Sequence, residues 1–405
     1  MRTNIYIFIL CLLFVGKAEL KAQENEFKGA RIAIGGSLST DLNWGQEGSH
    51  YFYNGIHPEK RDWFLGIQEA NLRSEFRFHK NFSFLGRLQL RRMWGNDLNE
   101  WVLAQAVLRY KSDNNKFRLE LGRFLLPIGN FYQNILPQDR LMVSPPLPYA
   151  YYVNISDQLG YASGLQEPGR IIYNGRRDWG SNMSYAYGYG NGLKFHWKII
   201  ADTLEVDLAI SQAAPIASPK LSRAFRPTLM GRIQYHPIYF WTQGFSFSYG
   251  GILDNNDETL LLENAGSFRQ LLLGTDFKTG FNYFEIGGEI IASRYRVPVF
   301  NDSLNQFTPN SPFTNPLWSL GAYADLKVEV PSFPGFYAAY RLGFIHFNRM
   351  ENGGSRWDDP LRRHSVALAY RINHFLILKS VYSWQRVSNQ DWPLDHWRTN
   401  LTIHF

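Results

Sequence analysis

Strict alternation of polar and apolar residues at the C-terminus is the feature that most constrains the fold of this chain. Trp397, Thr399, Leu401, Ile403 and Phe405 occupy the odd positions, and the even positions between them are all polar. Successive side chains of a β-strand point to opposite faces of the sheet, so the segment predicts a strand with one apolar and one polar face.

The same alternation recurs along the chain, in segments 69–77, 82–91, 320–330 and 366–372. Along the chain as a whole, alternating runs extend for about 9 to 15 residues, whereas strands of soluble sandwiches are usually about 5 to 6 residues long. A tilted strand that crosses a bilayer needs about 9 to 11 residues. The pattern therefore predicts an all-β transmembrane antiparallel barrel over residues 24–405, and a soluble sandwich or propeller is the alternative.

The composition agrees with a barrel that has a polar interior. Aromatic residues make up 16% of the chain, 34 residues are glycine, and the mean hydropathy is −0.30. Aromatic residues gather near the expected strand ends, for example at Trp63 and Phe64 or at Tyr239 and Trp241. Such clusters are typical of the interfacial girdles of membrane barrels.

Residues 1–23 have the pattern of an export signal, because a basic start at Arg2 precedes an apolar run too short to span a bilayer. The only cysteine, Cys11, lies in that run, so the mature chain is expected to be free of disulfides and thiolate metal sites. The formal net charge of +7 is spread along the chain without a clustered basic patch, which argues against a nucleic-acid partner.

The terminal strand that ends on Phe405 resembles the last strand of bacterial outer-membrane barrels. In those proteins the alternation and the final aromatic residue resemble the signal read by the barrel-assembly machinery. The assembly-signal residues in this chain would be Trp397, Leu401, Ile403 and Phe405. The resemblance implies a location in the outer membrane of a Gram-negative bacterium, in contact with its lipid.

Short and long connections alternate between the expected strands, as in barrels whose two ends face the periplasm and the exterior. We count roughly 18 strands, and 16 if a weak hairpin at 168–192 is not part of the barrel. The segment 126–166 is then the third external loop. A structureless segment of about 40 residues inside a compact domain is usually functional or disordered, and its many Tyr, Leu, Ile and Pro residues argue against disorder. Its position resembles that of the third loop of general porins, which folds into the lumen, and the resemblance implies the same here.

The run "LELGRFLLPIGNF", the following "PPLPYAYY" and the later "YAYGYGNG" resemble porins of the phosphate-selective porin O/P type and their relatives in Bacteroidetes-like bacteria. That resemblance implies a homotrimeric 16-stranded barrel through which small, often anionic, solutes diffuse. The resemblance also implies that a constriction lined by lysines would set the selectivity for phosphate. Segment 126–166 departs from it, with no lysine and only Arg140, next to Asp139.

Charged residues on the early strands are candidates for the lumen wall that faces this loop. An arginine-rich wall would attract anions. In the alternative interpretation, the arginines are neutralised by pairing with Glu75 and Glu120, since charges away from bulk water are usually paired. The candidate lumen and constriction residues are Arg73, Arg77, Arg87, Arg91, Arg118, Glu120, Arg123, Asp139 and Arg140.

Tyr149, Tyr151 and Tyr152 have two open roles. They could form a stacking surface for sugars, or they could pack the loop onto the wall, since a buried tyrosine usually acts as an apolar body with one hydrogen bond.

Residue patterns of catalysis and metal binding are weak, and we expect no cofactor. The ten histidines are scattered without zinc-ligand spacing on a helix, and no Gly-x-Ser-x-Gly motif occurs. The sequence therefore favours a passive channel for small hydrophilic solutes with a weak anion preference. The alternatives are a non-conducting barrel that binds polysaccharide through its external loops and an outer-membrane barrel hydrolase.

Overall fold

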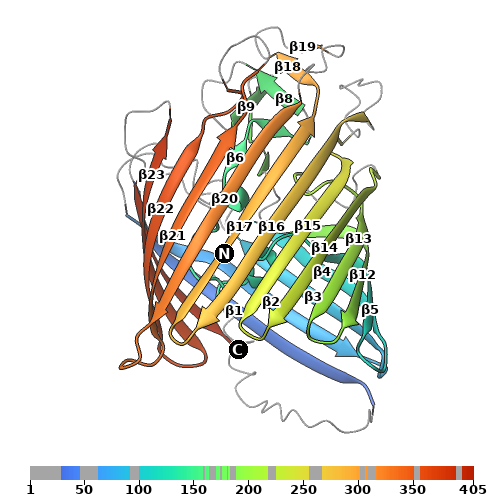
Figure 1. The fold of residues 1–405 in the computed structure, drawn as a ribbon, viewed down its shortest axis with the longest axis vertical. Coiled ribbons are helices and arrows are strands. Elements are labelled where there is room, and N and C mark those ends of the chain that lie inside the picture. Colours follow the sequence, from blue (N-terminus) through green and yellow to red (C-terminus); the bar gives the residue numbers. More distant parts are fainter. Residues whose placement is uncertain are drawn as a thin grey trace, which may run out of the picture.

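The computed structural model of the chain is a closed barrel of 16 antiparallel strands (Figure 1). The structure describes residues 29–45, 63–91, 100–157, 160–163, 170–173, 176–179, 181–182, 188–217, 225–254, 267–301, 306–308, 316–350, 356–388 and 395–405. Short connections gather at one end of the barrel, the turn end, and long connections at the other, the loop end.

The barrel strands are long and follow one another around the barrel in chain order. They are β1 (Arg31–Gly45), β2 (Trp63–Arg77), β3 (Phe82–Arg91), β4 (Glu100–Lys111), β5 (Phe117–Leu125), β12 (Tyr189–Ile200), β13 (Leu204–Ser211), β14 (Thr228–Ile238), β15 (Trp241–Gly251), β16 (Arg269–Phe281), β17 (Phe284–Arg296), β20 (Leu317–Glu329), β21 (Phe336–Phe347), β22 (Leu361–Arg371), β23 (Leu376–Val387) and β24 (His396–His404).

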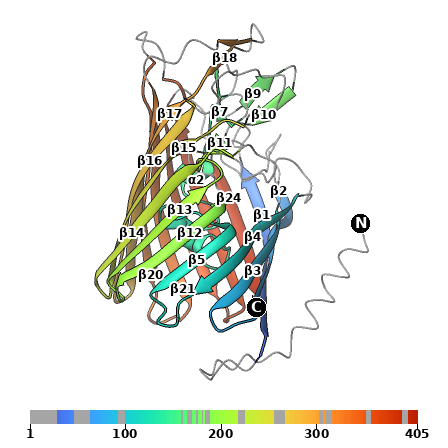
Figure 2. The ribbon, with the colours of Figure 1, turned by 90° about the vertical axis from the view of Figure 1, so that its right-hand side faces the viewer.

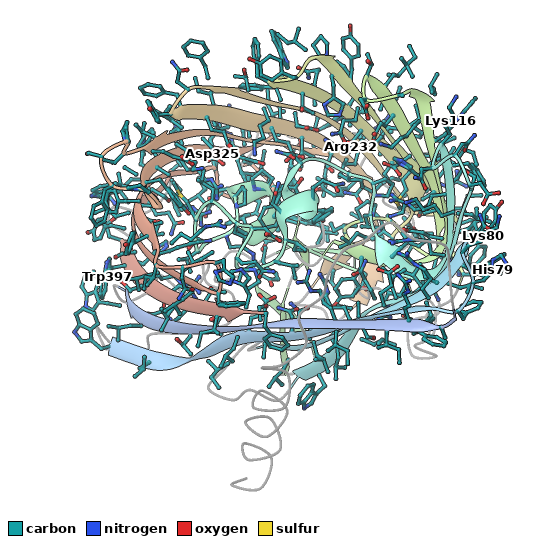
Figure 3. All side chains as sticks on the ribbon, turned by 90° about the horizontal axis from the view of Figure 1, so that it is seen from below. His79, Lys80, Lys116, Arg232, Asp325 and Trp397 are labelled. Carbon is teal, nitrogen blue, oxygen red and sulfur yellow. The ribbon has the colours of Figure 1, made fainter. Side chains whose placement is uncertain are left out.

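Apolar side chains cover the outer face of the barrel and polar ones its lumen. On β21, Tyr340, Leu342 and Phe344 are exposed on the outside, while Arg341 between them is buried on the inside. Figure 3 likewise shows Trp397 outside the ribbon. An exposed apolar band on a closed sheet is stable in lipid, because every strand is paired and no backbone edge is left open. The prediction of a transmembrane barrel is confirmed.

Exposed aromatic residues mark both ends of the apolar band. Tyr239 is 98% exposed and Phe281 70% exposed at the turn end, and Trp63 is 62% and Trp101 58% exposed at the loop end. Rings of this kind sit at membrane–water interfaces, so the two belts bound the part of the barrel that lipid covers.

The barrel has the lower of the two strand counts that the sequence allowed. The predicted hairpin at 168–192, which raised the count to 18, does not add two barrel strands: β9 (Arg170–Tyr173) and β10 (Arg176–Trp179) pair with each other in a separate sheet, and only residues 189–192 belong to the barrel, in β12. Their four-residue length is too short to cross a membrane. The third long connection therefore runs from residue 126 to 188, and we call it L3.

The tight turns at the turn end contain residues that tolerate left-handed backbone. Asn115, Asp202 and Asn282 have φ of 56°, 58° and 52°. Asn and Asp adopt this conformation more readily than other non-glycine residues, because their short polar side chains bond to the local backbone.

First and last strands close the barrel through a buried polar contact. Asp41 on β1 forms an ion pair with Arg398 on β24, and both side chains are almost fully buried. Phe405 exchanges backbone hydrogen bonds with Gly36, at 3.0 and 3.1 Å. A Cβ on Gly36 would lie 2.7 Å from the Phe405 ring, so a glycine is needed where the terminal aromatic residue packs.

L3 contains several short elements of its own. These are the 3₁₀-helix η2 (Phe131–Asn134), the helix α2 (Leu147–Ala150) and the strands β6 (Tyr152–Val153), β7 (Ile155–Ser156), β8 (Gly160–Ser163), β9, β10 and β11 (Ser181–Asn182). β8 pairs with β18 (Val299–Asn301) of another long connection, and β18 pairs with β19 (Gln306–Thr308). Figure 2 shows β9, β10 and β18 above the rim at the loop end.

No helix among the described residues is long and apolar enough to cross a membrane.

Candidate functional site in the barrel lumen

L3 enters the lumen directly after β5, and α2 lies near the centre of the barrel when the molecule is seen along its axis (Figure 3). Pro127 ends the strand, and Gly129 follows in left-handed backbone with φ 59°. A Cβ on Gly129 would lie 1.8 Å from Oε1 of Glu289 on the wall. Only glycine lets the loop pass this close to β17.

Tyr149 on α2 ties the loop to the wall. Its hydroxyl donates to Oε1 of Glu289 at 2.5 Å, and Tyr323 on β20 donates to Oε2 at 3.1 Å. Burial, helped by the Glu289 carboxylate, raises the pKa of Tyr149 well above its ordinary value, so the hydroxyl remains a donor. Asp276, directly opposite Glu289 in the sheet, is bound at 2.8 Å by Arg232, which points into the lumen.

Three cations of neighbouring strands hold the backbone of L3. Arg341 on β21 donates to the Ser144 carbonyl at 3.0 Å and pairs with Asp325 at 2.6 Å. Arg363 on β22 donates to the Pro145 carbonyl, and Lys379 on β23 donates to the carbonyls of Pro137, at 2.8 Å, and Arg140. A loop without regular hydrogen bonds needs donors for its carbonyls, and buried charged donors form the strongest such bonds.

The Arg140 side chain fastens the loop to β2, which is three strands from β23 around the closed barrel. Its guanidinium donates to Oε2 of Glu69 at 2.9 Å and to the Ile135 carbonyl at 2.7 Å. Asn71 and Gln89 donate to the other oxygen of Glu69. L3 is therefore attached to β2, to β21–β23 and, through Tyr149, to β17. Because β17 lies seven strands from β2 around the sixteen-stranded barrel, the loop spans the lumen.

Aromatic residues fill the space between L3 and the wall. Phe131 and Tyr132 lie 4.7 and 5.0 Å from the Tyr149 ring, and all three are buried. Leu272, Ile291 and other inward residues of β16 and β17 belong to the same cluster. The apolar core of the protein is thus inside the barrel, around L3.

Below L3, towards the turn end, a cavity of about 200 Å³ separates the loop from the wall. Asp139 and Gln138 of L3 line it, facing Lys278, Lys327 and Arg371 of the wall. Asp139, one of the predicted constriction residues, is exposed in this cavity.

Predicted arginines of β2, β3 and β5 lie beside carboxylates and beside each other. Arg73 lies directly opposite Arg87 on the lumen face of the β2–β3 pair. Arg77 approaches Glu75 at 3.5 Å, as the pairing interpretation proposed. Two arginines side by side repel each other, so neither neutralises the charge of the other.

Glu120 on β5 is surrounded by cations. Arg109 lies 2.8 Å away, Arg118 3.4 Å and Lys194 2.7 Å. Three positive groups share one negative group, so the cluster has a surplus of two positive charges (three minus one). The pairing that the sequence suggested is present, and it leaves the wall positive.

The remaining candidates have different placements. Arg123 donates to Oδ1 of Asn191 at 2.8 Å and to the Leu103 carbonyl at 2.9 Å, so it is held within the sheet. The side chain of Arg91 lies outside the described residues. Leu401 and Ile403 lie on the outer face of β24 with Trp397.

The three candidate tyrosines of L3 pack or pair within the loop. Tyr149 and Tyr151 are at most 2% exposed, and Tyr152 is half-buried in β6, paired with β11. The hydroxyl of Tyr151 donates to Asp358 at 2.8 Å, and the Asn154 backbone N–H donates to the same carboxyl at 2.9 Å. Burial raises the pKa of Asp358 to about 7.

The sequence analysis missed the functional residues of the later strands. Arg341, Arg363, Lys379 and Glu289 all have lumen-face parity in their strands, and that parity was visible in the sequence. The missing information was which of them meets L3, because contacts across a lumen have no sequence period.

No group of three or more His, Cys, Asp or Glu side chains able to hold a metal ion occurs among the described residues.

Fold and lumen together define a 16-stranded transmembrane barrel whose third loop folds inward. The anion-selective porin of Comamonas acidovorans has a TM-score of 0.57 at 7% identity, over 93% of this chain and 100% of the porin. The outer membrane channel DcaP of Acinetobacter baumannii has a TM-score of 0.57 at 8% identity, over 95% of this chain and 100% of the channel. OmpT of Vibrio cholerae in its trimer form has a TM-score of 0.55 at 9% identity, over 93% of this chain and 100% of the OmpT chain. No family profile and no curated protein sequence matches the chain.

Proposed function

We propose that this chain is a porin-type diffusion channel of a Gram-negative outer membrane that passes small hydrophilic solutes with a weak preference for anions. The fold supports a channel, since similar barrels include an anion-selective porin and an outer membrane channel. The observation that carries the anion preference is the triple cation contact at Glu120, together with the Arg73–Arg87 pair.

The proposed mechanism has a steric and an electrostatic part. L3 narrows the lumen and excludes large solutes, because it is attached to β2 through Arg140 and to β17 through Tyr149, two strands seven steps apart around the sixteen-stranded barrel. The positive wall raises the local concentration of anions, and the low dielectric of the surrounding sheet strengthens its field. Specific binding of phosphate is not part of the proposal, because Arg341, Arg363 and Lys379 are engaged with the L3 backbone.

Planar-bilayer recording of the refolded barrel tests conduction. We expect stable ohmic current steps from protein that shows a heat-modifiable shift on a gel. A barrel with that shift and no current steps would favour the second candidate, a non-conducting barrel that binds polysaccharide. The apolar cluster between L3 and the wall is the observation that favours this alternative, because it fills part of the lumen.

Reversal potential in a salt gradient tests selectivity. We expect a potential of the sign for anion preference, and we expect Arg73→Gln with Arg118→Gln to move it towards zero. Arg269→Gln with Arg294→Gln is the matched control, because both arginines lie on the outer face, on β16 and β17, and the pair removes the same two charges outside the lumen. A cation-selective wild type, or equal shifts in the two variants, would refute the assignment of the wall.

The proposed partners follow from the location and the fold. A homotrimer is supported by the trimer form of the similar OmpT structure, and native mass spectrometry would measure it. Delivery by the barrel-assembly machinery is supported by the C-terminal pattern that ends on Phe405, and Phe405→Ser should lower the amount of assembled barrel.

A further inference from the structure

On the outer face, near the loop end, a groove of about 620 Å³ lies over β20, β21 and β22. Its apolar part consists of Leu320, Leu342 and Phe344, which are 40%, 39% and 38% exposed. Arg356 and Arg362 line its loop side. The volume falls in the range of about 300 to 1,000 Å³ that ligand sites occupy.

Polarity changes abruptly along these strands. Towards the turn end, the outward positions of β20 and β22 carry Leu326, Val328, Val366 and Leu368. At the loop end the outward residues include basic ones: Arg294, Arg296, His346, Arg362 and His364. On β17 and β20–β22, the outward cations that the structure describes therefore lie at the loop end.

Arg356 and Arg362 have no carboxylate partner among the residues that the structure describes. This contrasts with Arg386 on the neighbouring strand, which pairs with Asp395 at 2.8 Å. In a chain where many lumen arginines meet carboxylates, two unpaired guanidinium groups beside an apolar groove leave room for an external anion.

We propose that this groove binds a phosphate-bearing lipid of the leaflet at the loop end, with its phosphate on Arg356 and Arg362 and its acyl chains along Leu320, Leu342 and Phe344. The proposal rests on the membrane orientation in the proposed function but not on conduction. Charge complementarity selects this occupant, because the groove joins an unpaired cationic rim to an apolar floor at lipid depth, as an anionic amphiphile requires.

The test titrates the purified full barrel in detergent with diphosphorylated lipid A and measures bound lipid by native mass spectrometry. Loss of one arginine next to a lipid phosphate weakens binding by roughly five- to tenfold. We therefore expect Arg356→Gln with Arg362→Gln to weaken binding about thirtyfold or more. Phe344→Ala should weaken it without any change of charge, and Arg356→Lys with Arg362→Lys should retain most of it.

Arg269→Gln is the control matched in charge to either single variant, Arg356→Gln or Arg362→Gln. Arg269 is also an outward arginine at the loop end, next to the Tyr249 ring, but it lies on β16 outside the groove. Wild-type binding by the double glutamine variant overturns the proposal. Equal losses in Arg269→Gln would indicate a diffuse charged belt and also overturn it.

Two further measurements distinguish the lipid from other occupants of the groove. Inorganic phosphate that competes as well as lipid A would indicate a free-phosphate site. A change of oligomeric state in the double variant without lipid would indicate a contact between copies. Either result overturns the lipid proposal. Bilayer recording of the same variants shows separately whether the barrel conducts, so a failure of the lipid proposal can be told apart from a failure of the proposed channel function.

Discussion

The Lys379 ammonium group on β23 lies 2.8 Å from the carbonyl oxygen of Pro137, so a buried cation of the wall holds the inward loop through its backbone. The same group also donates to the Arg140 carbonyl. Arg140 in turn pairs with Glu69 on β2. One short piece of L3 is thus bound to both β23 and β2, and its contacts give the first prediction.

Lys379→Met keeps the length of the side chain but removes its donors. We expect the barrel to lose about 1 to 3 kcal/mol of unfolding free energy, because two buried carbonyls lose their partner, and we expect more current noise from a looser L3. Thermal unfolding on gels and single-channel recording measure the two effects. Lys198→Met is the control, since Lys198 pairs with Glu205 on the wall. Equal noise in both variants would contradict the role of Lys379.

Tyr149→Phe removes the hydroxyl that reaches Glu289 from the loop, whereas Tyr323→Phe removes the one that reaches it from the wall. Each bond to a carboxyl contributes about 1.5 to 3 kcal/mol. We expect Tyr149→Phe to speed hydrogen exchange in residues 129–151 by at least tenfold, because that bond fixes α2. Tyr323→Phe should leave L3 protected. The reverse order would show that the loop does not depend on Tyr149.

Titration of the Asp358 carboxyl should make one contact of L3 depend on pH. This contact joins L3 to the connection between β21 and β22, where Asp358 lies. Its pKa of about 7 lies above the ordinary value near 3.8, so the folded state binds the proton more tightly than the open state. The contact is therefore fully stable below about pH 4, weakens as pH rises to about 7, and changes little above that. The total loss is on the order of 4 kcal/mol.

Hydrogen exchange at residues 151–157 between pH 4 and 8, corrected for intrinsic exchange rates, measures this dependence. Asp358→Asn should flatten it, because the amide does not titrate in this range. A profile of protection that rises with pH in the wild type would contradict the assigned direction.

Asp41→Asn breaks the buried ion pair that closes the barrel. We expect a loss of about 3 to 5 kcal/mol, because Arg398 keeps its charge in a buried position. The midpoint of the heat-modifiable gel shift measures it. Asp113→Asn is the control: Asp113 pairs with Lys80 at 3.2 Å in an exposed turn, and its loss should leave the midpoint unchanged. Equal shifts of the midpoint in the two variants would mean that the buried Asp41–Arg398 pair contributes no more to stability than an exposed pair.

The alternation of residues along each strand predicts which side chains face the lumen, but it does not predict which charges lie next to each other there. Arg73, Arg87 and Glu120 face inward as their strand positions predict. Lys194, which lies 2.7 Å from Glu120, comes from a strand 74 residues later (194 minus 120). Sequence order cannot reveal this neighbour, because L3 lies between the two strands in the chain while the barrel brings them into register.

The sequence by itself determined the barrel, its outward and inward faces and the presence of a long third connection, because strand periodicity and chain punctuation are local properties. Only the tertiary structure decided that the barrel has 16 strands, that the hairpin at 170–179 belongs to L3, and that Arg341, Arg363 and Lys379 hold the loop. Barrel closure creates these contacts by bringing together residues distant in the chain, and the need to satisfy buried polar groups then selects the pairs.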